Sequence, residues 1–197
     1  MNNLPPIILA SRSPRRLHLL RQIGINCKVE PSSVDETFSK NKSPLQNAKE
    51  IALKKARSIG SKHKNGIVIG ADTIVLLRNK VLTKPIDKID AEQMLHTLSG
   101  REHLVITAFA LYDCSSKKHV VHSETTRVKF RKLYPFEIHG YVNSGSPMDK
   151  AGAYGIQDDF GAVFVERVNG CYYNVVGLPL SSFYRTLISF LGSPKKR

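Results

Sequence analysis

The sequence predicts an α/β protein with a mixed β-sheet and flanking helices. Two helices with Ser-Pro openings alternate with short apolar strands, which is typical of crossover units with parallel strands. Two pairs of strand-like segments are separated by short turns, which indicates antiparallel hairpins in the same chain. Of the 197 residues, 41% are hydrophobic and 23% are charged, so the disordered, fibrous and membrane-spanning classes are excluded.

The N-terminal third contains the predicted crossover elements. Residues 6–10 form an apolar segment that we interpret as a short buried strand. Ser13-Pro14 then opens a helix, with serine as the N-cap and proline at the first helical position, and Gly24 ends it. The same opening at Ser43-Pro44 starts a second helix, whose apolar residues keep helical spacing as far as Gly60.

The remaining elements follow from the same patterns. They are a buried strand at 67–69, a hairpin of 74–77 with 81–82, a helix at 89–98, an antiparallel pair at 102–112 and 120–130, a helix at 135–143, a glycine-rich loop at 144–154, a hairpin of 162–168 with 172–176, and an amphipathic helix at 179–191. Gly70-Ala71-Asp72-Thr73 follows the strand at 67–69. We therefore expect this motif at the carboxyl end of that strand, where α/β sheets bind ligands.

The charge of the chain indicates an anionic partner. The formal net charge is +14, which is consistent with nucleic acid, an anionic surface or a polyphosphate. Residues 1–66 carry 13 basic and 4 acidic residues, so the excess is concentrated there. The basic residues 195–197 follow Gly192-Ser193-Pro194 and are expected to form a solvated tail. The motifs of the first third must therefore decide which anion is bound.

Composition also restricts the compartment. The longest apolar run near the start spans residues 7–10, far shorter than a signal-peptide core or the roughly 20 residues of a transmembrane helix. The three cysteines, Cys27, Cys114 and Cys171, are far apart and form no CxxC pair. We therefore expect reduced thiols in a cytoplasmic protein and not a disulfide framework or a zinc site.

The segment Ser11-Arg12-Ser13-Pro14-Arg15-Arg16 joins the first strand to the first helix. A helix N-terminus presents backbone N–H groups and the positive end of the helix dipole, and small hydroxyl residues let an anion approach closely. Arginines in the first helical turn are electrostatically disfavoured at this position. Either Arg15 and Arg16 point to solvent, or an anionic ligand such as a phosphate chain offsets the mismatch.

Two carboxylates are candidates for a polyphosphate site. Asp72 follows an apolar strand, and Glu36 follows Val34-Asp35 in another segment. Such a residue can cap a helix or make a turn, or it can hold Mg²⁺ or orient and deprotonate a water. Two separated carboxylates together with phosphate oxygens would supply the oxygen ligands that a hard divalent cation needs.

Two lysines and one loop complete the candidate residues. A lone lysine is usually a surface residue, but Lys55 lies within the second helix and Lys84 ends a short apolar strand. Residues 146–157 combine small residues that permit close approach to a ligand with aspartate, lysine, tyrosine and glutamine as polar contacts. No Walker A or GxGxxG pattern is present, so neither a P-loop NTPase nor a dinucleotide enzyme is supported.

Together these motifs resemble the Maf family of nucleoside triphosphate pyrophosphatases. The family pattern Ser-x-Ser-Pro-Arg-Arg-x-x-Leu-Leu matches residues 11–20. Further elements follow in order: Asp-Glu at 35–36, Ala-x-x-Lys-Ala at 52–56, Gly-Ala-Asp-Thr at 70–73, Lys-Pro at 84–85, and the segments 94–100, 149–157 and 174–180. The resemblance covers residues 7–191, so we expect a single Maf-like domain over 1–197, with the basic tail 192–197 outside the motifs.

The resemblance implies a cytoplasmic enzyme that cleaves a nucleoside triphosphate between the α- and β-phosphates and releases pyrophosphate. It implies two lobes around a deep cleft, as in inosine triphosphatases, and a homodimer. It also implies Mg²⁺ or Mn²⁺ as cofactor, held by Glu36 and Asp72, with Asp72 as the general base or the metal-bound activator of the attacking water. The other implied substrate contacts are Arg16, Lys55 and Lys84, which would neutralise the triphosphate, Ser11 and Ser13 at the helix start, and Asp149 and Lys150 from the opposite loop.

Three further residues relate to specificity. These are Arg15, Thr73 and Gln157. Family members that resemble this sequence at these positions act on dTTP and UTP, and the resemblance adds modified pyrimidine nucleotides as further expected substrates. A glutamine can pair with both the carbonyl and the N–H of a uracil-type edge. A sister group directed at 7-methyl-GTP carries a bulky aromatic at the first position, and that specificity is one alternative. A basic nucleic-acid-binding or cell-division regulatory protein is the other, although the sequence has no recognised nucleic-acid module.

Overall fold

The computed structural model describes residues 4–157 and 160–192. The described residues form two compact units. Unit 1 draws on the ranges 1–72, 107–124 and 177–197, and unit 2 comprises 73–106 and 125–176. The chain passes between the units at four points. Three of them lie within the strands β3, β5 and β6, which each contribute residues to both units, and the fourth follows the short helix Tyr172–Val176.

The strands form a mixed sheet, as predicted. Their order is β2 (Lys28–Val29), β1 (Ile7–Leu9), β3 (Ile67–Leu77), β5 (Glu102–Asp113), β6 (His119–Phe130) and β7 (Val165–Asn169), with β4 (Lys80–Leu82) paired to β3. The pairs β1–β2 and β1–β3 are parallel, whereas β3–β4 and β6–β7 are antiparallel. The predicted combination of crossover units and hairpins is therefore confirmed.

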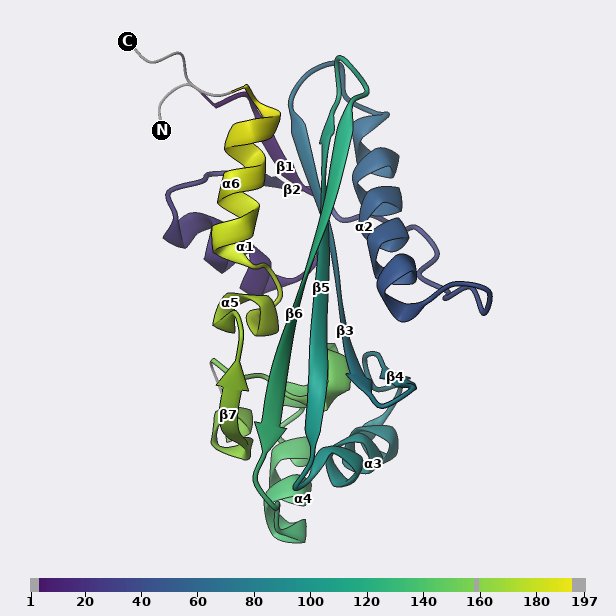
Figure 1. The fold of residues 1–197 in the computed structure, drawn as a ribbon, viewed down its shortest axis with the longest axis vertical. Coiled ribbons are helices and arrows are strands. Elements are labelled where there is room, and N and C mark those ends of the chain that lie inside the picture. The colour runs from purple at the N-terminus through teal and green to yellow at the C-terminus, as the bar shows by residue number, and fades with distance from the viewer. Residues whose placement is uncertain (1–3, 158–159, 193–197) are drawn as a thin grey trace. The chain divides into compact units, whose positions relative to one another are not determined.

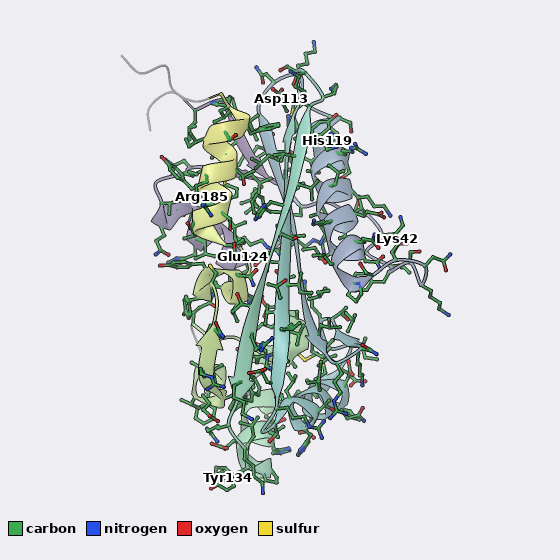
Figure 2. The ribbon with its side chains drawn as sticks, viewed as in Figure 1. Lys42, Asp113, His119, Glu124, Tyr134 and Arg185 are labelled. Atoms are coloured by element: carbon green, nitrogen blue, oxygen red, sulfur yellow. The ribbon has the colours of Figure 1, made fainter. Side chains whose placement is uncertain are left out.

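Unit 1 has helices on both sides of its strands. Figure 1 shows α2 (Pro44–Gly60) on one side of these strands, and α1 (Pro14–Gln22) and α6 (Leu180–Phe190) on the other. All three residues of β1 are buried, as expected for a parallel strand covered on both faces. The ring of Phe183 on α6 meets Phe109 of β5 edge-on, with centroids 5.5 Å apart. Ser182 of α6 also donates to the carboxylate of Glu124, which Figure 2 labels beside this helix.

Helix α2 lies unusually close to β3 at Gly70. A Cβ atom added to Gly70 would lie 2.1 Å from the carbonyl oxygen of Ala52 and 2.7 Å from the backbone nitrogen of Ala56. Both helix residues are fully buried alanines, which leave room for the backbones to approach. The spacing Ala-x-x-x-Ala on α2 and the glycine on β3 are therefore two halves of one close contact.

Unit 2 has its own apolar core, to which α3 (Lys88–Leu98), α4 (Pro135–Asn143) and the strand ends contribute. At its centre the rings of Phe130 and Tyr154 meet edge-on, with centroids 4.7 Å apart. His103 of β5 lies against both rings, and its Nε2 shares a hydrogen bond of 2.8 Å with the hydroxyl of Tyr154. Burial lowers the pKa of His103 to about 4 and raises that of Tyr154, so both groups are neutral in the folded state.

The His103–Tyr154 contact anchors the glycine-rich loop. This segment consists of two short 3-10 turns, Ser146–Asp149 and Ala151–Ala153. The backbone N–H of Gly155 donates to the hydroxyl of Tyr141, and that of Gly152 donates to the carbonyl oxygen of Thr83. The loop is therefore fixed by polar contacts at several points along its length.

Two predicted elements are wrong. Residues 70–73 do not follow a strand but continue it, since β3 runs without interruption from Ile67 to Leu77. The predicted hairpin of 162–168 with 172–176 does not form, because β7 pairs with β6 and residues Tyr172–Val176 form the short helix α5. The buried amide of Asn174 on α5 donates to the carbonyl oxygen of Val105 and the hydroxyl of Thr126, each at 2.9 Å. These long-range acceptors are not evident from local sequence.

The other predicted elements are confirmed to within two residues at their ends, including the helices α3, α4 and α6. Asp113 and His119, labelled in Figure 2, flank the turn that joins β5 to β6. The very short β2 was not expected from the sequence. Within the described residues, none of the helices has the length and apolar character needed to cross a membrane.

The contact at Gly70 gives a stability prediction. Gly70→Ala should lower the free energy of unfolding by about 1–3 kcal/mol or more, because backbone atoms of α2 must move to admit the methyl group. Gly140→Ala is the matched control: this helical glycine has no atom within 4 Å of an added Cβ, so the change should be neutral or stabilise by up to about 1 kcal/mol. Urea unfolding measures both, and equal effects would contradict the close contact.

The buried imidazole gives a pH prediction. His103 has a pKa of about 4 in the folded protein against about 6.5 in an unfolded chain. The unfolded state therefore binds more protons between these values, and stability is lost as the pH falls from about 6.5 to 4. Between pH 7 and pH 4 the wild type should lose about 2–3 kcal/mol more than His103→Gln does. Chemical denaturation at several pH values measures this, and parallel losses in the two proteins would contradict it.

Candidate functional site

The start of α1 brings Arg16 into the interior of unit 1. Ser11 follows β1, and its hydroxyl accepts hydrogen bonds from the backbone N–H of Ser13 at 3.2 Å and from Arg16 Nη1 at 3.0 Å. Arg16 Nε donates to the carbonyl oxygen of Gly177 at 2.9 Å, and the residue is only 8% exposed. Arg16 therefore does not point to solvent, whereas Arg12 is exposed.

The charge of Arg16 is balanced by carboxylates. Burial is the largest influence on its guanidinium and lowers its pKa, while Asp72 and, to a smaller extent, Glu36 act in the opposite direction. Arg15, which is half-buried, adds to the lowering by like-charge repulsion. Desolvating a guanidinium is costly unless an opposite charge lies nearby. The acidic groups that serve this purpose are the two candidate carboxylates of the sequence.

Lys55 joins these two carboxylates. Its ammonium nitrogen lies 2.7 Å from Glu36 Oε2 and 3.0 Å from Asp72 Oδ1, and 3.5 Å from the carbonyl oxygen of Ala71. The lysine side chain is 8% exposed and that of Asp72 11%, whereas that of Glu36 is 53% exposed. The ion pair with Asp72 is therefore shielded from solvent, and Glu36 reaches it from the outer side.

The close contact at Gly70 explains this arrangement. Asp72 lies two residues after Gly70 on β3, so both residues face the same side of the strand. Lys55 immediately precedes Ala56, one of the alanines that touch Gly70. The same approach of helix to strand therefore brings the lysine next to the aspartate.

The loop that carries Glu36 is fixed by an amide that sequence reasoning did not single out. Asn47 of α2 is 5% exposed, and its carbonyl oxygen accepts from the backbone N–H of Ser39. Its amide nitrogen donates to the carbonyl oxygens of Ser39, Lys42 and Ser43. A buried asparagine at helical spacing among apolar residues is the signal that could have identified it. Figure 2 labels Lys42 in this loop.

The carboxylates fit a hard divalent cation only in part. Among the described residues, no group of three or more His, Cys, Asp or Glu side chains could hold a metal ion. Mg²⁺, however, is commonly bound by one or two carboxylates together with substrate phosphates and water. Glu36 and Asp72 meet that requirement, because both lie within hydrogen-bond distance of one lysine nitrogen.

Unit 2 contains the remaining predicted residues. Lys84 is exposed just after β4, and Thr73 is half-buried in β3. Lys150 donates to the carbonyl oxygen and hydroxyl of Ser146 and pairs with Asp149 at 2.9 Å, so both charged residues take part in the first 3-10 turn. Gln157 differs from these: its side-chain carbonyl oxygen is buried and has no hydrogen-bond partner within the described residues.

The structure therefore sorts the predicted residues into two sets. Unit 1 brings together Arg16, Lys55, Asp72, Glu36 and Ser11 through hydrogen bonds and charge interactions, with Ser13 and Arg15 at the same helix start. Unit 2 holds Thr73, Lys84, Asp149, Lys150 and Gln157. His103 and Asn47, which hold the surrounding loops, were not among the predicted site residues. The partner of His103, Tyr154, lies 51 residues away in the chain, whereas Asn47 bonds to residues close to the start of its own helix.

Comparison with known proteins identifies the family. Curated relatives named dTTP/UTP pyrophosphatase include one from Syntrophomonas wolfei, 49% identical over 91% of this chain and 94% of its own length. Another, from Aquifex aeolicus, is 45% identical over 92% and 93%. Among solved structures, the Ham1 protein of Staphylococcus aureus shows a weak similarity, with a TM-score of 0.43 and 14% sequence identity. The match covers 64% of this chain and 71% of that chain. The family model described as Maf-like protein matches residues 6–190, and the chain therefore belongs to the Maf family.

Proposed function

We propose that this chain is a nucleoside triphosphate pyrophosphatase that hydrolyses dTTP and UTP to the nucleoside monophosphate and pyrophosphate. The observation that carries the proposal is the buried Lys55–Asp72 pair, joined by Glu36 and close to the buried Arg16. This cluster combines carboxylates, which can deprotonate a water or bind a metal ion, with cations that can bind phosphate. It occurs in a chain 43–49% identical to proteins named dTTP/UTP pyrophosphatase.

The start of α1 is suited to the phosphate chain. Ser13 is the N-cap and its side chain makes no capping hydrogen bond, so its hydroxyl is available to a phosphate oxygen. Helix N-termini favour anions through their N–H groups and dipole. Arg15 and Arg16 in the first turn add positive charge, and no acidic residue occupies that turn. We assign Ser11, Ser13 and the two arginines to this role. The family resemblance supports Lys84, Asp149 and Lys150 as further substrate contacts.

Asp72 is the proposed general base. Its carboxylate accepts the proton of a water whose oxygen forms a bond to the α-phosphorus. The bond from that phosphorus to the bridging oxygen breaks, and pyrophosphate leaves with the bridging oxygen. In the free protein Lys55, at 3.0 Å from Asp72, holds this carboxylate in place.

Glu36 and Asp72 are the residues that would hold the divalent cation. Mg²⁺ or Mn²⁺ bound there would offset the negative charge of the triphosphate and of the leaving pyrophosphate. The protein itself contributes two carboxylate ligands, so phosphate oxygens and water must complete the coordination. This requirement links the metal site to the presence of substrate.

Gln157 is proposed to recognise the nucleobase, and Arg15 and Thr73 are the other two proposed specificity residues. Its buried carbonyl oxygen has no partner within the described chain, and an unsatisfied buried acceptor favours a ligand that brings a donor. Uracil and thymine present an N–H between two carbonyl groups. The carboxamide can accept from that N–H and donate to a neighbouring carbonyl, whereas cytosine has an acceptor at the same ring position.

The cellular compartment and the oligomeric state complete the proposal. The enzyme acts in the cytoplasm, where its substrates are made and where Cys27, Cys114 and Cys171 would stay as the free thiols that they are in the structure. It functions as a homodimer, which the family resemblance supports. Size-exclusion chromatography with light scattering tests the dimer directly.

Removing the base tests the mechanism. Asp72→Asn should lower kcat for UTP and dTTP by about 10²–10⁴-fold, because the amide cannot accept the proton. The measurement is pyrophosphate release with Mg²⁺ or Mn²⁺. Asp113→Asn is the control, since asparagine also supports the turn that Asp113 makes with Ser115. Full activity in Asp72→Asn would contradict the assignment, and salt-sensitive nucleic-acid binding without pyrophosphatase activity would favour the regulatory alternative.

Removing the carboxamide tests specificity. Gln157→Ala should lower kcat/KM for UTP by about 10–100-fold, because one or two hydrogen bonds to the base are lost, and should leave that for CTP almost unchanged. Gln93→Ala, at an exposed position on α3, is the control. A panel that includes 7-methyl-GTP measures the ratios. An unchanged UTP/CTP ratio, or a preference for 7-methyl-GTP, would overturn the role given to Gln157.

A further inference from the structure

Lys55 already occupies the position between the two carboxylates. An ammonium group has three donors, and three oxygens surround this one: Glu36 Oε2 at 2.7 Å, Asp72 Oδ1 at 3.0 Å and the carbonyl oxygen of Ala71 at 3.5 Å. The side chain is 8% exposed, so solvent takes little part. In this state the lysine satisfies the carboxylates that a divalent cation would otherwise bind.

We propose that Lys55 is a stand-in cation: it holds Glu36 and Asp72 in the free protein, keeps metal affinity low there, and releases them when a triphosphate arrives. The proposal rests on the proposed function for the identity of that anion. Its consequence is an order of binding. The metal enters together with the nucleotide and is not resident in the free enzyme.

The charge count of the cluster supports this order. Arg16 and Lys55 carry two positive charges, and Glu36 and Asp72 carry two negative charges, so the free cluster is balanced. A divalent cation alone would add two uncompensated charges next to a shielded ammonium, where repulsion is strong. A triphosphate brings several negative charges together with new acceptors for the lysine. Metal and nucleotide together therefore avoid the positive excess that metal alone would create.

A purely structural ion pair makes a different prediction. If Lys55 served only to stabilise the fold, its removal would lower stability and leave metal binding unchanged. If it were only a phosphate ligand, its removal would weaken nucleotide binding and again leave metal binding by the free protein unchanged. Metal affinity without nucleotide therefore separates the stand-in role from both.

The experiment is a titration with Mn²⁺ alone, followed by electron paramagnetic resonance of the free ion. Lys55→Met removes the charge and keeps a similar length of apolar side chain. It should bind Mn²⁺ at least about tenfold more tightly than the wild type, because the repulsion is gone and the carboxylates are exposed to the ion. Lys54→Met, an exposed neighbour on the same helix, should bind as the wild type does. Equal affinity in Lys55→Met and the wild type would overturn the proposal.

A second measurement uses the wild type only and does not depend on the folding of a variant. Adding α,β-imido-UTP, which cannot be cleaved, should tighten Mn²⁺ binding at least about tenfold after correction for ion held by free nucleotide. Tight Mn²⁺ binding by the wild type without nucleotide would overturn the stand-in role. Failure of the analogue to bind at all would instead overturn the proposed function, and the titration without nucleotide would still decide the role of Lys55.

Discussion

The site of unit 1 depends on the close approach of α2 to β3 at Gly70. The backbone of the helix lies where any side chain at residue 70 would be, and Ala52 and Ala56 keep the helix surface flat at this point. This contact brings the Lys55 ammonium to 3.0 Å from Asp72. A wider spacing would separate lysine and aspartate and remove a shielded ion pair from both charges, which is costly.

The cluster that results is electrically balanced although the chain as a whole is strongly basic. The formal net charge of +14 suggested an anion, but two buried cations, Arg16 and Lys55, already face Asp72 and Glu36. The excess charge belongs mainly to exposed residues, where it can attract anions over distance. What selects an anion at the site is the arrangement of partners and not the total charge.

In unit 2, neutral groups hold the glycine-rich loop in place. This loop carries Lys150, precedes Gln157 and is fixed at Tyr154 and Gly152 by contacts to β5 and to the residue before Lys84. His103 has a buried ring nitrogen without a partner in the described chain, and the neutral ring is maintained by burial. The loop is thus held in place mainly by packing and by hydrogen bonds between neutral groups.

The sequence by itself determined most elements, the mixed sheet, the family and the residue types of the site, because caps, turns and apolar periodicity are local signals. Tertiary structure decided that Asp72 lies within β3 and not after it, that Arg16 turns inward to Gly177, and that residues 172–176 form a helix. It also decided that one lysine bridges Glu36 and Asp72. Each of these depends on partners far away in the chain, and the free energy of burying a charge or an amide is set by those partners and not by its sequence neighbours.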